Sequence, residues 1–296
     1  MRKALRYIVA ATVLAFWVAY VWRNWESFAA LSWTLNPAYL LAAFAFYTGF
    51  YLVMGAGWAL ALRAMARNAD FAAALRIWIV STPARYLPGT GWHIAGRTYL
   101  GARAGMTVKD LLVSTYVEQA LAVVSGLIVF VVAATFGGVV LVGTGFYLVI
   151  LIPVGLTLAH PRLLQMLLNQ ASRALKKDSV EIKLSFSQVL ALLVWFAFSH
   201  VLSGVSLFLV LASVSPTPLH MLPAVVGASA LGWVVGLLSI LTPGGIGVRE
   251  ATIVMLSSTF VAVPVMSSAA FATRFISALA EVFLVAISAL VSLRRA

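Results

Sequence analysis

The sequence predicts an all-α polytopic membrane protein built from two inverted repeats, each with three transmembrane helices and one broken re-entrant helical hairpin. Three observations predict this fold class. Hydrophobic residues make up 63% of the 296 residues and charged residues only 9%, whereas soluble domains contain about 25%. Long uncharged stretches alternate with short basic segments. Residues 82–91 and 241–251 interrupt apolar stretches with prolines and glycines, and their separation of about half the chain indicates an internal repeat.

The composition also excludes several classes of protein. The chain has no cysteine, which excludes disulfides and thiolate-held metal clusters. Its four histidines and eight acidic residues form no metal-binding or nucleotide-binding motif, so we expect no cofactor and no metal site. A net charge of +12 would suggest nucleic acid as the partner of a soluble protein. In this apolar chain we expect no nucleic acid, and we attribute the charge to loops lying against an anionic cytoplasmic leaflet.

The first repeat is predicted at residues 1–159. It begins with a basic segment followed by an apolar stretch, a pattern that predicts a helix running from the cytoplasm outwards. Its re-entrant hairpin, at about residues 71–104, enters from the cytoplasmic side, breaks at Pro83 and again at Pro88-Gly89, and returns. Proline breaks a helix because it lacks the backbone N–H group that the helical hydrogen bond needs.

The second repeat is predicted at residues 188–296, after a basic cytoplasmic loop at residues 160–187. Its re-entrant hairpin, at about residues 220–263, enters from outside and breaks at Pro243-Gly244-Gly245. Residues 222–241 are also long enough to cross the bilayer alone, which is the alternative to a hairpin. In all, spanning helices are predicted at residues 7–22, 37–62, 109–134, 139–158, 188–212 and 265–293.

The basic residues set the orientation of these segments. Those near the predicted helix ends fall on one side of the membrane, including Arg97, Arg103 and Lys109, while Arg23 alone falls on the other. Because cytoplasmic loops are enriched in lysine and arginine, we expect the N-terminus and the C-terminus to be cytoplasmic.

The two helix breaks predict a substrate site. Irregular backbone at membrane depth is tolerated only where protein or a water-filled cavity surrounds it, and paired breaks of this kind mark the substrate sites of secondary transporters. A connection at the membrane surface is the alternative interpretation. The first break contributes Arg85, Pro88, Gly89 and Gly91 to the predicted site, and the second contributes Pro243, Gly244, Gly245, Gly247, Arg249 and Glu250.

Charged residues within the predicted helices suggest what this site holds. Glu118 and Arg274 occupy matching positions when the two repeats are aligned, which predicts a central ion pair, and Glu281 lies two turns beyond Arg274. In the functional interpretation Arg274 alternates between Glu118 and an anionic substrate, and Arg85 and Arg249 add phosphate contacts. In the structural interpretation the pair only holds the repeats together.

Residues 85–89 (RYLPG) and 243–251 (PGGIGVREA) resemble the lysylphosphatidylglycerol synthase transmembrane family over almost the whole chain. The resemblance implies a multi-pass protein of the bacterial cell (inner) membrane. In bifunctional relatives this region is associated with moving an aminoacylated phospholipid between leaflets, while a soluble domain makes that lipid. We expect a stand-alone member without the soluble aminoacyltransferase domain.

These observations lead us to expect a lipid transporter, or flippase, for a phospholipid or another lipid with an anionic phosphate. The sequence shows no catalytic constellation, so no catalytic residue is assigned and no enzymatic activity is expected. Two alternatives stay open: a membrane-embedded lipid-linked glycosyl- or aminoacyl-transferase, and a non-catalytic partner of a lipid-modifying enzyme. The expected partners are membrane lipids, with a second copy of the chain or a lipid-modifying enzyme as further candidates.

Overall fold

A computed structural model describes residues 22, 36–66, 69–86, 91–136, 162–163, 165–166, 169–170, 184–239 and 243–293. The regular elements in these residues are all helices. The predicted helices at residues 7–22 and 139–158 lie outside the described residues, apart from Trp22. Most of the predicted loop at 160–187, together with Pro88 and Gly89, lies outside them as well.

The same order of elements occurs twice along the described chain: a long helix, a shorter helix, a 3₁₀ turn, a short helix and a long helix. The first series is α3 (Pro37–Met65), α4 (Phe71–Ser81), η1 (Thr82–Tyr86), α5 (Trp92–Arg103) and α6 (Val108–Phe136). The second is α9 (Phe186–Val214), α10 (Leu222–Leu238), η3 (Pro243–Gly245), α11 (Val248–Ser257) and α12 (Val263–Leu293), with the short turn η2 (Leu219–Met221) before α10.

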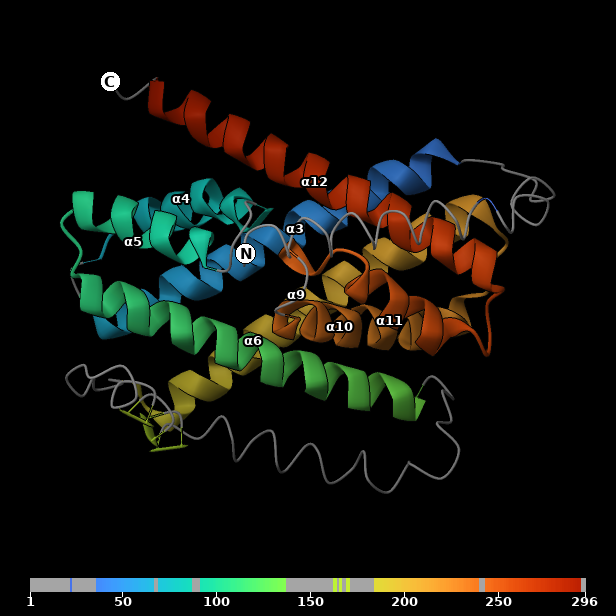
Figure 1. Cartoon of the computed structure of the whole chain (residues 1–296), viewed down its shortest axis with the longest axis horizontal. Helices are drawn as coiled ribbons and strands as arrows, with labels where there is room; N and C mark the ends of the chain where they lie inside the picture. Colours follow the sequence, from blue (N-terminus) through green and yellow to red (C-terminus); the bar gives the residue numbers. More distant parts are fainter. Residues whose placement is uncertain are drawn as a thin grey trace, which may run out of the picture.

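The two series are arranged around a central pair of helices. The first helix of each series, α3 and α9, pack against each other over much of their length. Figure 1 shows α4 and α5 at one end of the molecule and α10 and α11 at the other, while α6 and α12 run along opposite sides. The turns η1 and η3 contact each other, so the inner ends of the two helical pairs meet in the middle of the molecule.

Polar residues cap the helices where the sequence places them. Asn36 accepts a hydrogen bond from the backbone N–H of Ala38 at 3.0 Å, and Pro37 follows as the first helical residue of α3. Asp70 caps α4 in the same way, and Ser185 forms a capping box with Gln188 at the start of α9. These caps satisfy backbone donors that the first turn of a helix leaves free.

Five of the described helices are long and apolar enough to cross a membrane: Pro37–Met65, Val108–Phe136, Phe186–Val214, Leu219–Leu238 and Val263–Val291. The chain is therefore a multi-pass membrane protein. The fourth of these helices includes the first limb of the predicted second hairpin, and its length suits a full span as well as a deep hairpin.

Charged side chains are distributed unevenly along the described residues. One end of the molecule, where α3 and α5 finish and α4 and α6 begin, carries Arg63, Asp70, Arg103 and Lys109. The opposite end is formed by residues 36–50, 125–136, 205–222 and 255–265, which contain no Asp, Glu, Lys or Arg. The other charges of the long helices and breaks lie between these ends.

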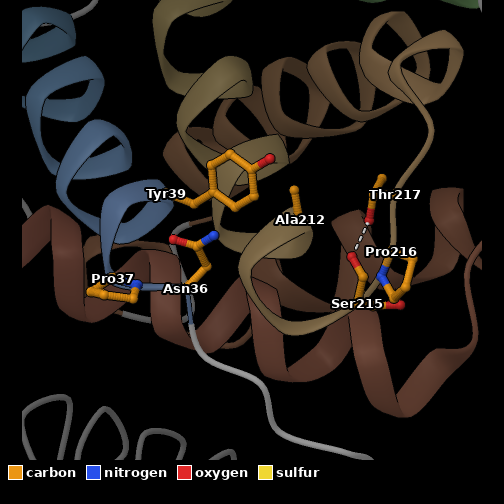
Figure 2. A pocket seen from close by; sticks show the side chains of 7 residues that line it. All are labelled: Asn36, Pro37, Tyr39, Ala212, Ser215, Pro216 and Thr217. Carbon is orange, nitrogen blue, oxygen red and sulfur yellow. Dashed lines mark hydrogen bonds between the residues drawn. The ribbon is translucent and has the colours of Figure 1, made fainter.

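The uncharged end has a hollow (Figure 2). It lies between the start of α3 and the end of α9 and is lined by Asn36, Pro37, Tyr39, Ala212, Ser215, Pro216 and Thr217. Thr217 donates a hydrogen bond to the carbonyl oxygen of Ser215 at 2.9 Å. The lining has no charged group and none of the residues predicted for the substrate site.

Candidate functional site

The first helix break begins where the sequence predicts it. The α-helical hydrogen bonding of α4 ends at Ser81, two residues before Pro83, and the chain continues as the 3₁₀ turn η1. Ser81 and Thr82 donate their hydroxyl hydrogens to the carbonyl oxygen of Trp78, at 3.1 and 2.6 Å. Gly91, with φ of 91°, then starts α5 in a left-handed conformation that glycine adopts without strain.

The second break depends on three glycines with positive φ angles: 60° at Gly244, 68° at Gly245 and 84° at Gly247. At Gly245 a β-carbon would lie 2.6 Å from the carbonyl oxygen of Gly236, a contact that backbone cannot relieve easily. Glu250 accepts a hydrogen bond from the backbone N–H of Gly247 at 2.7 Å and so caps the start of α11. These glycines therefore provide positive φ angles, and Gly245 also allows close approach of the backbone of Gly236.

The two breaks lie against each other, although they are far apart in the sequence. A β-carbon on Gly244 would lie 3.2 Å from the ring of Tyr86. Tyr86 is the last residue of η1, and Gly244 lies in the middle of η3. Residues from both breaks therefore form one site with residues from α3 and α12.

Arg85 is the best-connected cation of this site. Its guanidinium group donates hydrogen bonds to the hydroxyl oxygens of Tyr51 at 2.6 Å and Tyr86 at 3.2 Å. It also forms an ion pair with Glu281, which α12 contributes. The same guanidinium lies 5.4 and 5.1 Å from the ring centroids of Tyr51 and Tyr86, within the range of cation–π attraction. A quarter of the Arg85 side chain stays exposed.

Arg274 and Arg249 are the other two cations of the site. Arg274 donates a hydrogen bond to the carbonyl oxygen of Gly244 at 2.7 Å, and its other terminal nitrogen lies 4.0 Å from Glu250. Arg249 is buried and donates to the hydroxyl oxygen of Tyr47 at 2.7 Å. Together these residues form the central cluster, defined as Tyr47, Tyr51, Arg85, Tyr86, Gly244, Arg249, Glu250, Arg274 and Glu281.

The predicted pair between Glu118 and Arg274 is wrong. Glu118 pairs instead with Arg97, and its other oxygen accepts a hydrogen bond from the indole N–H of Trp78 at 2.6 Å. The reason is the packing of α5 against α6, which brings Arg97 to Glu118. Arg274 is held by the second break, on a different part of the molecule. We refer to Arg97 and Glu118 as the buried pair.

Arg97, counted by the sequence among the basic residues of the cytoplasmic side, faces the protein interior. Its side chain is only 2% exposed, and its guanidinium lies 4.7 Å from the ring centroid of Trp58. Counting basic residues near helix ends cannot distinguish a residue that faces solvent from one that faces the next helix. Arg97 is therefore a buried cation that the sequence argument missed.

The tyrosines of the central cluster were also missed. Tyrosine is common where a helix meets the membrane surface, so the residue type alone does not point to a buried site. Tyr47 and Tyr51, however, lie in the interior of α3 and are fully or almost fully buried. Their spacing of one helical turn places both on the same face, and this spacing was the available signal.

The central cluster has the chemistry of an anion site. Among its described residues, Arg85, Arg249 and Arg274 are opposed by two carboxylates, Glu250 and Glu281, so one positive charge is in excess. Guanidinium groups and phenolic hydroxyls are donors that match the oxygens of phosphate and carboxylate. Within the described residues, no three histidine, aspartate or glutamate side chains gather where a metal ion could bind.

Comparison with known proteins identifies the family. The chain matches the family described as "Lysylphosphatidylglycerol synthase TM region" over residues 4–289, which is nearly its whole length. Among curated proteins, none matches the chain. The match covers both helix breaks, the central cluster and the buried pair. The chain therefore belongs to the lysylphosphatidylglycerol synthase transmembrane family.

Proposed function

We propose that the protein is a lipid transporter that moves a phospholipid, or another lipid with an anionic phosphate, between membrane leaflets. The observation that carries the proposal is the meeting of two broken helices around Arg85, Arg249 and Arg274. Three guanidinium groups within a membrane protein are costly unless they bind something or pair with acids. The central cluster supplies one acid too few.

The repeated order of elements supports this function. We infer that the two series are inverted repeats and that α4–α5 and α10–α11 are re-entrant hairpins entering from opposite sides. Inverted repeats with discontinuous helices place the substrate site of secondary transporters near the middle of the bilayer. The positions of the two helical pairs at opposite ends of the molecule, with their inner turns in contact, agree with this inference (Figure 1).

The charge distribution supports an orientation. The end with Arg63, Arg103 and Lys109 would face the cytoplasm, and the uncharged end would face outside. This orientation gives a cell-membrane protein with both termini in the cytoplasm. The partially exposed guanidinium groups of Arg85 and Arg274 would then be the points at which a lipid phosphate first binds.

The experiment that tests the function is reconstitution of the purified chain into vesicles with labelled lipids, followed by measurement of leaflet position and lipid mass. The proposal expects lipid to change leaflet without change in mass. A new lipid product would instead indicate an enzyme, the first alternative class. If the lipid neither changes leaflet nor changes in mass, the result would favour the other alternative, a protein that acts through a lipid-modifying partner. Empty vesicles and vesicles with heat-denatured protein are the controls.

A further inference from the structure

Glu281 lies where a bound phosphate would be expected. It is only 5% exposed, and one of its oxygens, Oε1, faces two donors of the first break. These donors are the guanidinium group of Arg85, which forms the ion pair, and the hydroxyl of Tyr86 at 3.3 Å. A phosphate oxygen is held by the same combination of a guanidinium and neutral donors. The carboxylate therefore occupies a position suited to a substrate oxygen.

Glu250, the other acid of the central cluster, has a different task. One of its oxygens accepts a hydrogen bond from the backbone N–H of Gly247 at 2.7 Å, and the other lies 4.0 Å from Arg274. Removing it would leave the first turn of α11 without its cap. Glu281 makes no such backbone contact among the described hydrogen bonds, so it is the carboxylate that can share its donors with a substrate.

We propose that Glu281 determines which head groups the site accepts, by competing for Arg85 and limiting the site to one additional negative charge. This inference rests on the proposed lipid-binding function and names its specificity residue. With Glu281 present, the central cluster has one excess positive charge, which one phosphodiester neutralises. A phosphomonoester carries a charge of about −1.5 to −2 at pH 7 and would leave excess negative charge in a poorly solvated site.

The position of Glu281 also links binding to structure. Its carboxylate comes from α12, whereas Arg85 and Tyr86 come from the first break. A phosphate that shared these donors would weaken the contact between α12 and η1. Specificity and the coupling of the two repeats would then depend on the same ion pair.

The test compares two lipids that differ in the charge of the phosphate. The full chain is placed in nanodiscs with equal amounts of phosphatidylglycerol, a phosphodiester, and phosphatidic acid, a phosphomonoester, at pH 8. The ratio of the two bound lipids is read by mass spectrometry. Wild-type protein should favour phosphatidylglycerol, and Glu281→Gln should shift the ratio by about tenfold or more towards phosphatidic acid. An unchanged ratio would overturn the proposal.

Asp110→Asn is the control, because it neutralises a carboxylate at the charged end of the molecule that hydrogen-bonds locally to Thr107 and shares no hydrogen bond with the central cluster. It should leave the lipid ratio unchanged, and an equal shift in this variant would also overturn the proposal. If Glu281→Gln does not fold, Glu281→Asp keeps the charge and should keep the wild-type preference; its loss would contradict the role of charge. Failure of wild-type protein to move either lipid in vesicles would refute the transporter function, while the binding ratio would still decide the role of Glu281.

Discussion

Neutralising one member of the buried pair should destabilise the protein strongly. The side chains of Glu118 and Arg97 are 1% and 2% exposed, so neither can recover solvation when its partner is lost. Glu118→Gln keeps an oxygen that can accept the indole N–H of Trp78, so the main loss is the carboxylate charge. Leaving a buried charge unpaired costs about 3–5 kcal/mol of the free energy of unfolding.

A double-mutant cycle tests whether the two residues act as a pair. Arg97→Gln should cost a similar amount because it leaves the buried Glu118 carboxylate without its cationic partner, beside the indole N–H of Trp78. The double variant contains no unpaired charge, so its loss should be smaller than the sum of the single losses by about 2–3 kcal/mol. The assay is equilibrium unfolding in mixed micelles, followed by the fluorescence of tryptophans such as Trp58 and Trp78, which contact Arg97.

A second double-mutant cycle, with Glu118 and Arg274, is the control for the first. Glu118→Gln and Arg274→Gln should be additive to within about 0.5 kcal/mol, because the two side chains share no hydrogen-bond partner. Additivity in the Arg97 cycle together with strong coupling in the Arg274 cycle would restore the pairing suggested by sequence alignment of the repeats. That result would refute the packing of α5 against α6 as the source of the pair.

Two further perturbations test the breaks and the orientation. Gly245→Ala should lower the free energy of unfolding by more than the roughly 1–2 kcal/mol of a left-handed residue, because the new methyl group meets the backbone of Gly236. Gly105→Ala is the control: Gly105 has a φ of 81°, and no atom lies within 4 Å of the position of a β-carbon there. This variant should lose only the roughly 1–2 kcal/mol of a left-handed residue. Equal losses of unfolding free energy in the two variants would show that the close approach at Gly245 is unimportant. In this cysteine-free chain, Lys109→Cys should react with a membrane-impermeant thiol reagent from the inner side only and His220→Cys from the outer side only. Labelling of both from the same side would contradict the proposed orientation.

Much of the fold follows from local sequence. Asn36-Pro37 predicts the start of α3, and Pro83 and the glycines after Pro243 predict the ends of the helices that precede them, because these residues act through their own backbone. The gathering of Arg85 and Arg249 near the breaks was also predictable. Which acidic residue pairs with which arginine was not predictable. Whether Glu118 meets Arg97 or Arg274 depends on how the helices rotate and pack, which the repeat alignment does not contain.

The tyrosine hydroxyls are a second feature of the site that the sequence could not predict. The residue type suggests the membrane surface, and only the position of Tyr47 and Tyr51 against the two breaks shows that they are donors inside the protein. The predicted helices and loop outside the described residues, and the division of the chain into repeats at residues 1–159 and 188–296, remain predictions.

The central claim is that Arg85, Arg249 and Arg274 bind the phosphate of a transported lipid. The most direct measurement is the rate of lipid movement between leaflets in vesicles that contain each Arg→Gln variant, with folding checked by size-exclusion chromatography. Losing one charged hydrogen-bond donor costs about 1.5–3 kcal/mol, so each variant should be slower by about tenfold or more. Arg103→Gln, an exposed arginine at the charged end, should match the wild-type rate. Wild-type rates in all three central variants, or an equal loss in Arg103→Gln, would contradict the account.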